Sequence, residues 1–180
     1  MGTTGALRES FASHYGEVPL LARTFLRTLK PSFADSLSGE TTVARTPSSD
    51  TVTEGVRIQA GAQFMPADSN PEAKQFVYAY RIVIKNEGTR RARLKARHWI
   101  ILDADNNRED VRGPGVVGKT PDLGPGEQFE YVSGCPLRTK WGTMEGTYLM
   151  EREDGQQFEV VIGRFFLVPS APKIASVAKK

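Results

Sequence analysis

From Thr51 onward, the polarity of the side chains alternates with a period of two residues rather than 3.6. The clearest run carries an apolar side chain at every second position: Phe76, Tyr78, Tyr80, Ile82 and Ile84. Such alternation is typical of a β-strand with one buried face. Glycine, proline, asparagine and aspartate separate the runs, and no helical pattern lies between them. The sequence therefore predicts an all-β fold, an antiparallel β-sandwich.

The other apolar runs supply the remaining strands of this sandwich. We expect a first strand across Val52–Phe64, bulged at Gly61. Further strands are expected at 92–103, 108–112, 127–133, 144–151 and 156–168. The last two are joined across Asp154-Gly155, which is a strong hairpin signal. The run Trp99–Leu102 is apolar at every position and predicts a central strand packed on both faces.

Residues 1–50 differ in character and form an N-terminal extension. Apolar residues, including Leu21 and Phe25, recur near helical spacing until Pro31 and predict a short amphipathic helix over 19–30. The polar stretch that follows predicts a flexible linker. Two interpretations stay open for the extension. It is either an organelle-targeting leader or an ordered docking arm, whose Leu21 and Phe25 would contact a partner.

Composition and charge limit the classes of protein to which the chain can belong. The 180 residues fit one domain, at 51–168, with the extension before it and a tail at 169–180. A net charge of +3, from 24 basic and 21 acidic residues, is too mild an asymmetry to identify a nucleic-acid binder. Cys135 is the only cysteine, which excludes an internal disulfide and suits a reducing intracellular compartment, cytoplasm or organelle matrix. No apolar run reaches the roughly 18 residues of a membrane span, so we expect no membrane insertion.

The segment Gly113–Thr120 satisfies both the phosphate-loop and the dinucleotide-binding patterns. Both kinds of site need a helix directly after the glycines, but two prolines and two glycines within Pro121–Gly126 break any helix. The match therefore does not indicate a nucleotide site. Two readings remain, a tight inter-strand loop or a backbone nest for small anions. The residues of the nest would be Arg112, Gly113, Gly115, Gly118 and Lys119.

Four basic residues alternate along and just before the strand expected at 92–103: Arg91, Arg93, Lys95 and Arg97. At period two they would project from one face, about 7 Å apart, which is comparable to the spacing of phosphates along a nucleic-acid strand. Two interpretations stay open, a solvated outer strand face, which is usual for charged strand residues, and RNA contact. Together with the basic N-terminal helix, the latter suggests a subunit or assembly factor of an organellar ribonucleoprotein.

The spacing of residues in the sequence gives little support for a metal site or a catalytic site. Asp103 and Asp105 have the spacing that opens an EF-hand loop, but Arg108 and Pro114 stand where that loop needs glycine and glutamate. His98 is the sole histidine of 51–168 and has no metal-ligand spacing around it. We therefore expect neither a metal nor a cofactor.

Nucleophilic catalysis would need Ser133 or Cys135 beside a base. Only His98 could serve as that base, and nothing in the sequence places it there. We therefore expect the chain not to be an enzyme.

Five motifs occur in a fixed order: Arg97–Ile101, Asp110–Gly118, Leu123–Glu127, Tyr131–Leu137 and Gly142–Tyr148. Together they closely resemble the ApaG domain, and the likeness covers about 51–168. The resemblance implies a fibronectin type III/immunoglobulin-like antiparallel β-sandwich, here preceded by the N-terminal helix. The chain departs from the family pattern at Lys119-Thr120, where acidic or amide residues are commoner.

The resemblance also bears on function. The domain occurs alone in bacteria and attached to other modules in an F-box ubiquitin-ligase subunit and a DNA-polymerase-interacting protein, where it looks like an interaction module. Bacterial members carry a label linking them to cobalt and magnesium efflux, and their glycine motif has been proposed to bind pyrophosphate-like groups. We therefore expect a non-enzymatic protein-interaction module, an adaptor or subunit of a larger complex, with Trp141 as an apolar anchor. The alternatives are the ribonucleoprotein subunit and a binder of pyrophosphate-like anions through Gly113–Gly118.

Overall fold

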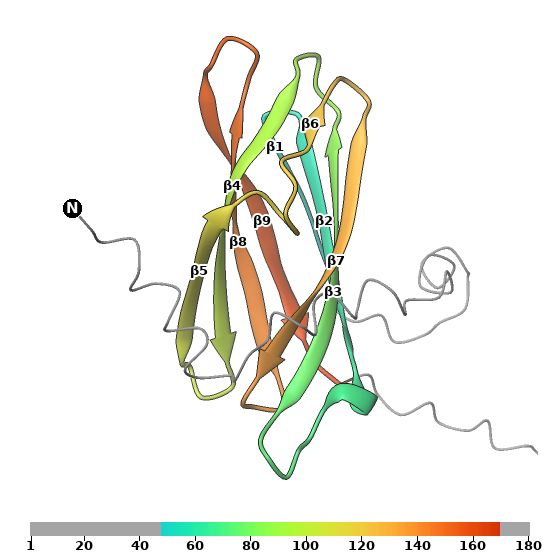
Figure 1. The fold of residues 1–180 in the computed structure, drawn as a ribbon, viewed down its shortest axis with the longest axis vertical. Helices are drawn as coiled ribbons and strands as arrows, with labels where there is room; N and C mark the ends of the chain where they lie inside the picture. The colour runs from blue at the N-terminus through green and yellow to red at the C-terminus, as the bar shows by residue number, and fades with distance from the viewer. Residues whose placement is uncertain (1–47, 170–180) are drawn as a thin grey trace, which may run out of the picture. The chain divides into compact units, whose positions relative to one another are not determined.

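The computed structural model describes residues 48–169, which form an all-β domain (Figure 1). Its strands are β1 (Ser49–Thr53), β2 (Val56–Phe64), β3 (Phe76–Asn86), β4 (Ala92–Asp103), β5 (Arg108–Pro114), β6 (Asp122–Leu123), β7 (Gln128–Leu137), β8 (Gly142–Glu151) and β9 (Gln157–Leu167). One short 3-10 helix, η1 (Pro66–Asp68), follows β2. Within this range no helix has the length and apolar character needed to cross a membrane. The helix predicted at 19–30, with Leu21 and Phe25, lies outside the described residues.

Two antiparallel sheets face each other across the core. One has the strand order β1-β2-β3-β7 and the other β5-β4-β8-β9, with β6 paired to the start of β4. This arrangement confirms the predicted all-β, immunoglobulin-like antiparallel sandwich. The strand predicted at 92–103 coincides with β4 because its flanking turns and its alternation are both marked in the sequence.

The strand predicted across Val52–Phe64 is wrong, because the chain reverses within it. Glu54 and Gly55 take φ values of 47° and 81°, so that β1 and β2 form a hairpin. The predicted bulge is wrong as well, since Gly61 lies opposite Arg81 in an uninterrupted ladder. The sequence misleads because Val52 continues the apolar alternation although its side chain is 52% exposed.

The run Trp99–Leu102 alternates between the two faces of its sheet. Trp99 and Ile101 face the core and are buried, whereas Ile100 and Leu102 lie on the outer face and are half-buried. The prediction that this strand is packed on both faces is therefore wrong, because its outer side chains are only half-buried.

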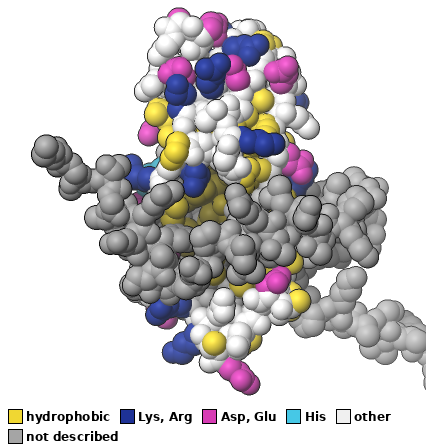
Figure 2. All heavy atoms as spheres, in the orientation of Figure 1, with side chains coloured by type: hydrophobic (Ala, Val, Ile, Leu, Met, Phe, Trp, Pro, Cys, Tyr) yellow, Lys and Arg dark blue, Asp and Glu magenta, His cyan; other side chains and the backbone are white. Residues whose placement is uncertain are grey.

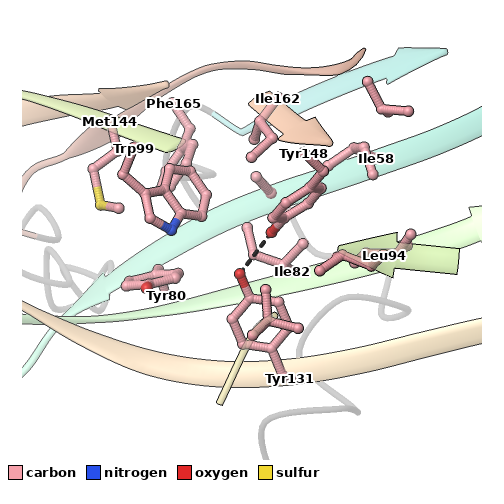
Figure 3. Packing of buried hydrophobic residues seen from close by; sticks show 14 of the residues in the cluster. Ile58, Tyr80, Ile82, Leu94, Trp99, Tyr131, Met144, Tyr148, Ile162 and Phe165 are labelled. Carbon is pink, nitrogen blue, oxygen red and sulfur yellow. Dashed lines mark hydrogen bonds between the residues drawn. The ribbon is translucent and has the colours of Figure 1, made fainter. Parts of the chain in front are cut away.

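Aromatic side chains fill the middle of the sandwich (Figure 3). The Trp99 ring packs against Tyr80, Tyr148 and Phe165, with ring centroids 5.5, 6.1 and 6.1 Å away. The hydroxyl groups of Tyr131 on β7 and Tyr148 on β8 share a hydrogen bond of 2.6 Å across the two sheets. The two sheets are thus joined by ring packing and by one buried polar contact.

The two long sides of the sandwich differ. On one side, the Thr51 hydroxyl donates to the carbonyl of Val161 at 2.8 Å, and the Val161 N–H donates to the Thr53 hydroxyl at 3.2 Å. These bonds tie β1 to β9. On the other side β5 and β7 end their sheets without pairing to each other, and the segment after β5 crosses the gap toward β6 and β7 (Figure 1).

The buried hydroxyl pair leads to a testable expectation. Replacing Tyr131 or Tyr148 alone by Phe leaves the other hydroxyl buried without its partner, which should lower the free energy of unfolding by about 1–3 kcal/mol. The double variant Y131F/Y148F removes both polar groups and should lose less than the sum of the single variants. Urea unfolding of the four proteins measures this coupling, and strictly additive losses would contradict it.

Candidate functional site

The glycine loop is a compact turn that begins where β5 ends. Val116 is fully buried and packs in the core. Its N–H donates to the carbonyl of Lys119, and the Lys119 N–H donates back to Val116, both at 2.8 Å. Val117 and Gly118 occupy the corners of this turn with φ values of 45° and 77°. The left-handed conformation explains the glycine at 118 and leaves the β-branched Val117 strained.

Two glycines of the motif lie at close approaches, and only that of Gly115 is too close for any side chain. Gly115 has a φ of 56°, and a Cβ added there would overlap the carbonyl oxygen of Lys119. A Cβ on Gly113 would lie 3.3 Å from both terminal nitrogens of the Arg97 guanidinium. Gly113 therefore leaves the space in which the Arg97 side chain lies.

Arg97 is the cation that contacts the glycine loop. Its Nη1 donates to the carbonyl oxygens of Pro114 at 2.9 Å and Gly115 at 2.7 Å. Arg112, which the sequence assigns to the anion nest, instead lies opposite His98 on the outer face of the sheet. Arg97, and not Arg112, is therefore the arginine beside the glycine loop.

The backbone of the loop is largely used for its own structure. The Gly115 N–H donates to the carbonyl of Lys95 at 2.9 Å, and the N–H groups of Val116 and Lys119 pair across the turn. The Lys119 ammonium lies 5.7 Å from the centre of the Phe129 ring. Anion binding at this loop stays a prediction, and it depends on the charges of Arg97 and Lys119 rather than on these N–H groups.

The basic stripe predicted on β4 is interrupted. The pairing of β4 with β8 shifts register between Leu94 and Ala96, so that Lys95 is an extra residue. Leu94 and Trp99 therefore both face the core although five positions separate them. Arg97 follows the phase of Trp99 and lies on the inner face. The expectation that all four basic residues share one face is wrong.

The other three basic residues pair with carboxylates. Arg91 and Arg93 lie 3.2 and 2.7 Å from the Asp122 carboxylate, and Lys95 lies 3.1 Å from Glu151. The hydrogen bond from Arg93 is the main cause that lowers the pKa of Asp122, and that from Lys95 lowers the pKa of Glu151. These pairs reduce the positive field that RNA contact would need. These pairs cannot be read from the sequence, because Arg93 and Asp122 are 29 positions apart and Lys95 and Glu151 are 56 positions apart.

The residues considered for catalysis are not brought together. His98 Nε2 lies 2.7 Å from Asp110 on the outer face, and Arg108 also pairs with that carboxylate. Arg108 and then His98 hold the pKa of Asp110 well below its usual range. Cys135 is buried among core residues, where burial raises the pKa of its thiol to about 12. Within residues 48–169, no group of three or more His, Cys, Asp or Glu side chains could hold a metal ion.

Trp141 lies in the loop between β7 and β8, and hydrogen bonds fix that loop. Thr139 accepts from the Ala104 N–H at 3.0 Å and donates to the carbonyl of Trp141 at 2.8 Å. The Tyr78 hydroxyl donates to the carbonyl of Lys140 at 2.5 Å. The Trp141 side chain nevertheless stays 47% exposed. The sequence predicted Trp141 as an anchor but did not predict the hydrogen bonds to the carbonyls of Lys140 and Trp141.

The fold and the glycine loop define an immunoglobulin-like β-sandwich domain rather than a nucleotide-binding domain. Residues 66–152 match the family model described as the ApaG domain. Protein ApaG of Dechloromonas aromatica (strain RCB) is 50% identical over 119 residues, which cover 66% of this chain and 94% of that protein. Protein ApaG of Methylobacterium nodulans is 48% identical over 115 residues, covering 64% of this chain and 88% of the relative.

The comparison with solved structures gives a similar result. A crystal structure of an ApaA protein from Bordetella pertussis superposes with a TM-score of 0.61 at 43% identity, covering 69% of this chain and 97% of that one. This chain belongs to the ApaG family.

The glycines of the loop should differ sharply in their tolerance of a side chain. Gly118→Ala adds only the strain of a left-handed alanine and should cost about 1 kcal/mol of unfolding free energy. Gly115→Ala adds a clash with the Lys119 carbonyl to that strain and should cost about 3 kcal/mol. Urea denaturation compares the two, and equal losses would show that Gly115 is not required by this close approach.

The Cys135 thiol should be unreactive in the folded protein. Because burial raises its pKa to about 12, almost no thiolate is present at pH 8. Alkylation by iodoacetamide should therefore be slower than in denaturant by about 100-fold or more. Mass spectrometry measures the rate, and fast labelling of the native chain would reveal an accessible thiol.

Proposed function

We propose that this chain is a non-enzymatic protein-interaction module, an adaptor or subunit of a larger complex, that contacts its partner through the β7–β8 loop. The observation that carries the proposal is the fixed, exposed position of Trp141. Aromatic side chains on rigid backbone dominate binding energies, because they bury a large area and lose little conformational entropy on binding.

The loop cannot easily withdraw Trp141 from solvent. The carbonyl of Lys140 accepts from Tyr78 on β3, and the carbonyl of Trp141 accepts from Thr139 of the same loop. The next residue, Gly142, approaches the Leu102 carbonyl so closely that an added Cβ would lie 2.5 Å from it. These contacts fix the backbone from which the indole projects, which supports Trp141 as a preorganised contact for a partner. Lys140 is also exposed and adds positive charge beside the indole.

His98 pairs with Asp110 on the outer face of its sheet whereas the Cys135 thiol is buried in the core, and this separation supports a function without catalysis. Binding of pyrophosphate-like anions is a second candidate. It is supported by Arg97 and Lys119, neither of which has a carboxylate partner in the part of the chain that the structure describes. The ribonucleoprotein alternative has weaker support, because Arg91, Arg93 and Lys95 already face carboxylates.

Purification of the full chain from its native cells tests the proposal. We expect Trp141→Ala to lower the recovery of the co-purifying partner by about tenfold, which corresponds to about 1.4 kcal/mol. Phe166→Ala is the matched control, because Phe166 is an aromatic residue of similar exposure, 38%, on β9.

Unchanged recovery with W141A would contradict the proposed surface. A partner that sediments at the size of a ribosome and is lost after RNase treatment would favour the ribonucleoprotein alternative instead.

A further inference from the structure

The side of the sandwich between β5 and β7 is only partly covered, by the segment after β5, whose Val116 packs in the core (Figure 1). Both strands end their sheets, and in residues 48–169 nothing pairs with their outer edges. Figure 2, in the orientation of Figure 1, shows hydrophobic side chains on this side of the molecule. Val111 on β5 and Phe129 on β7 are only partly buried against the core. An additional element could bury more of this surface.

The two edges are not equally open to pairing. β5 carries charged side chains at four of its seven positions and ends at Pro114, and both features discourage the addition of a strand. β7 has neither feature within Tyr131–Cys135. Alternate N–H and C=O groups of this stretch point away from β3. The edge that favours an added strand is therefore that of β7.

A buried donor in the core lacks an acceptor. Trp99 is 2% exposed, and its Nε1–H has no hydrogen-bond partner. In Figure 3 the indole nitrogen points toward Tyr80 and Tyr131, on the side where β7 lies. An unsatisfied buried N–H is destabilising, so an acceptor that enters from the side between β5 and β7 would remove this cost.

Positive charge lies beside this donor. Arg97 precedes Trp99 by two residues and shares its inner face. Within residues 48–169 its hydrogen bonds run from Nη1 to the carbonyls of Pro114 and Gly115, which leaves Nε and Nη2 for another acceptor. A carboxylate can pair with the guanidinium through these two nitrogens.

We propose that an extended segment of a partner protein adds to the edge of β7 at Tyr131–Cys135 and inserts an acidic side chain between the sheets. The carboxylate accepts from Trp99 Nε1 and pairs with Arg97. Residues two positions to either side of the acid face the same way and pack as apolar side chains against Val111 and Phe129. This inference rests on the proposed interaction function but uses a surface other than Trp141.

Two-dimensional NMR of the full chain with a defined probe tests the inference. The probe is the capped heptapeptide Thr-Val-Thr-Glu-Thr-Val-Thr, which presents Val, Glu and Val on one face. The two tryptophans give two indole N–H signals, and Trp141→Phe assigns them. We expect saturable movement of the Trp99 signal, slower exchange of amides in Tyr131–Cys135, and no movement of the Trp141 signal.

Matched variants identify the contacts. A probe with Gln in place of Glu should bind about tenfold more weakly, and so should the original probe on Arg97→Gln. A probe with an N-methylated backbone should not bind, because it cannot pair with an edge. The peptide variants leave the protein unchanged, so they decide the matter even if R97Q does not fold.

A Trp99 signal that stays unmoved at about 1 mM probe would overturn the inference, since that concentration detects dissociation constants up to about 1 mM. Equal binding of the Glu and Gln probes would overturn it as well. These results are separable from the proposed function. If W141A loses the native partner while the probe fails to bind, the interaction function stands and only the peptide site is wrong.

Discussion

The packing of Trp99 between the two sheets is the interaction on which the rest of the domain depends. Its ring meets Tyr80 from one sheet and Tyr148 and Phe165 from the other, so the indole fixes the distance between the layers. The Tyr131–Tyr148 hydroxyl pair then restricts sliding of the layers, because its 2.6 Å bond tolerates little displacement. The orientation of β4, and with it the position of Arg97, follows from this packing.

The glycine motif shows how one pattern can arise from different causes. In nucleotide-binding proteins the glycines allow a phosphate to approach the backbone. Here Gly113 accommodates the Arg97 guanidinium and Gly115 accommodates the Lys119 carbonyl. The requirement for a small residue is the same, but the neighbour that imposes it belongs to the protein itself. Sequence patterns of this kind report close approach, not the identity of what approaches.

Sequence predicted the sandwich because alternation and turn residues are local signals. It predicted β3 and β4 well and missed the β1–β2 hairpin, whose turn at Glu54 carries no aspartate or asparagine. The candidate site was harder to predict. The contacts of Arg97 depend on how β4 pairs with β8, and the carboxylates that face Arg93 and Lys95 come from distant segments. Such contacts are set by tertiary structure, which no local pattern encodes.

The extra residue at Lys95 makes β4 a strand whose two halves have opposite parity. Before it, even-numbered side chains face the core, as Leu94 does; after it, odd-numbered ones do, as Trp99 does. The chain thereby joins a half that presents Arg93 to solvent with a half that directs Arg97 inward. A relative that lacks this extra residue needs its alignment gap at Lys95, because a gap placed beyond Arg97 would assign Arg97 to the wrong face.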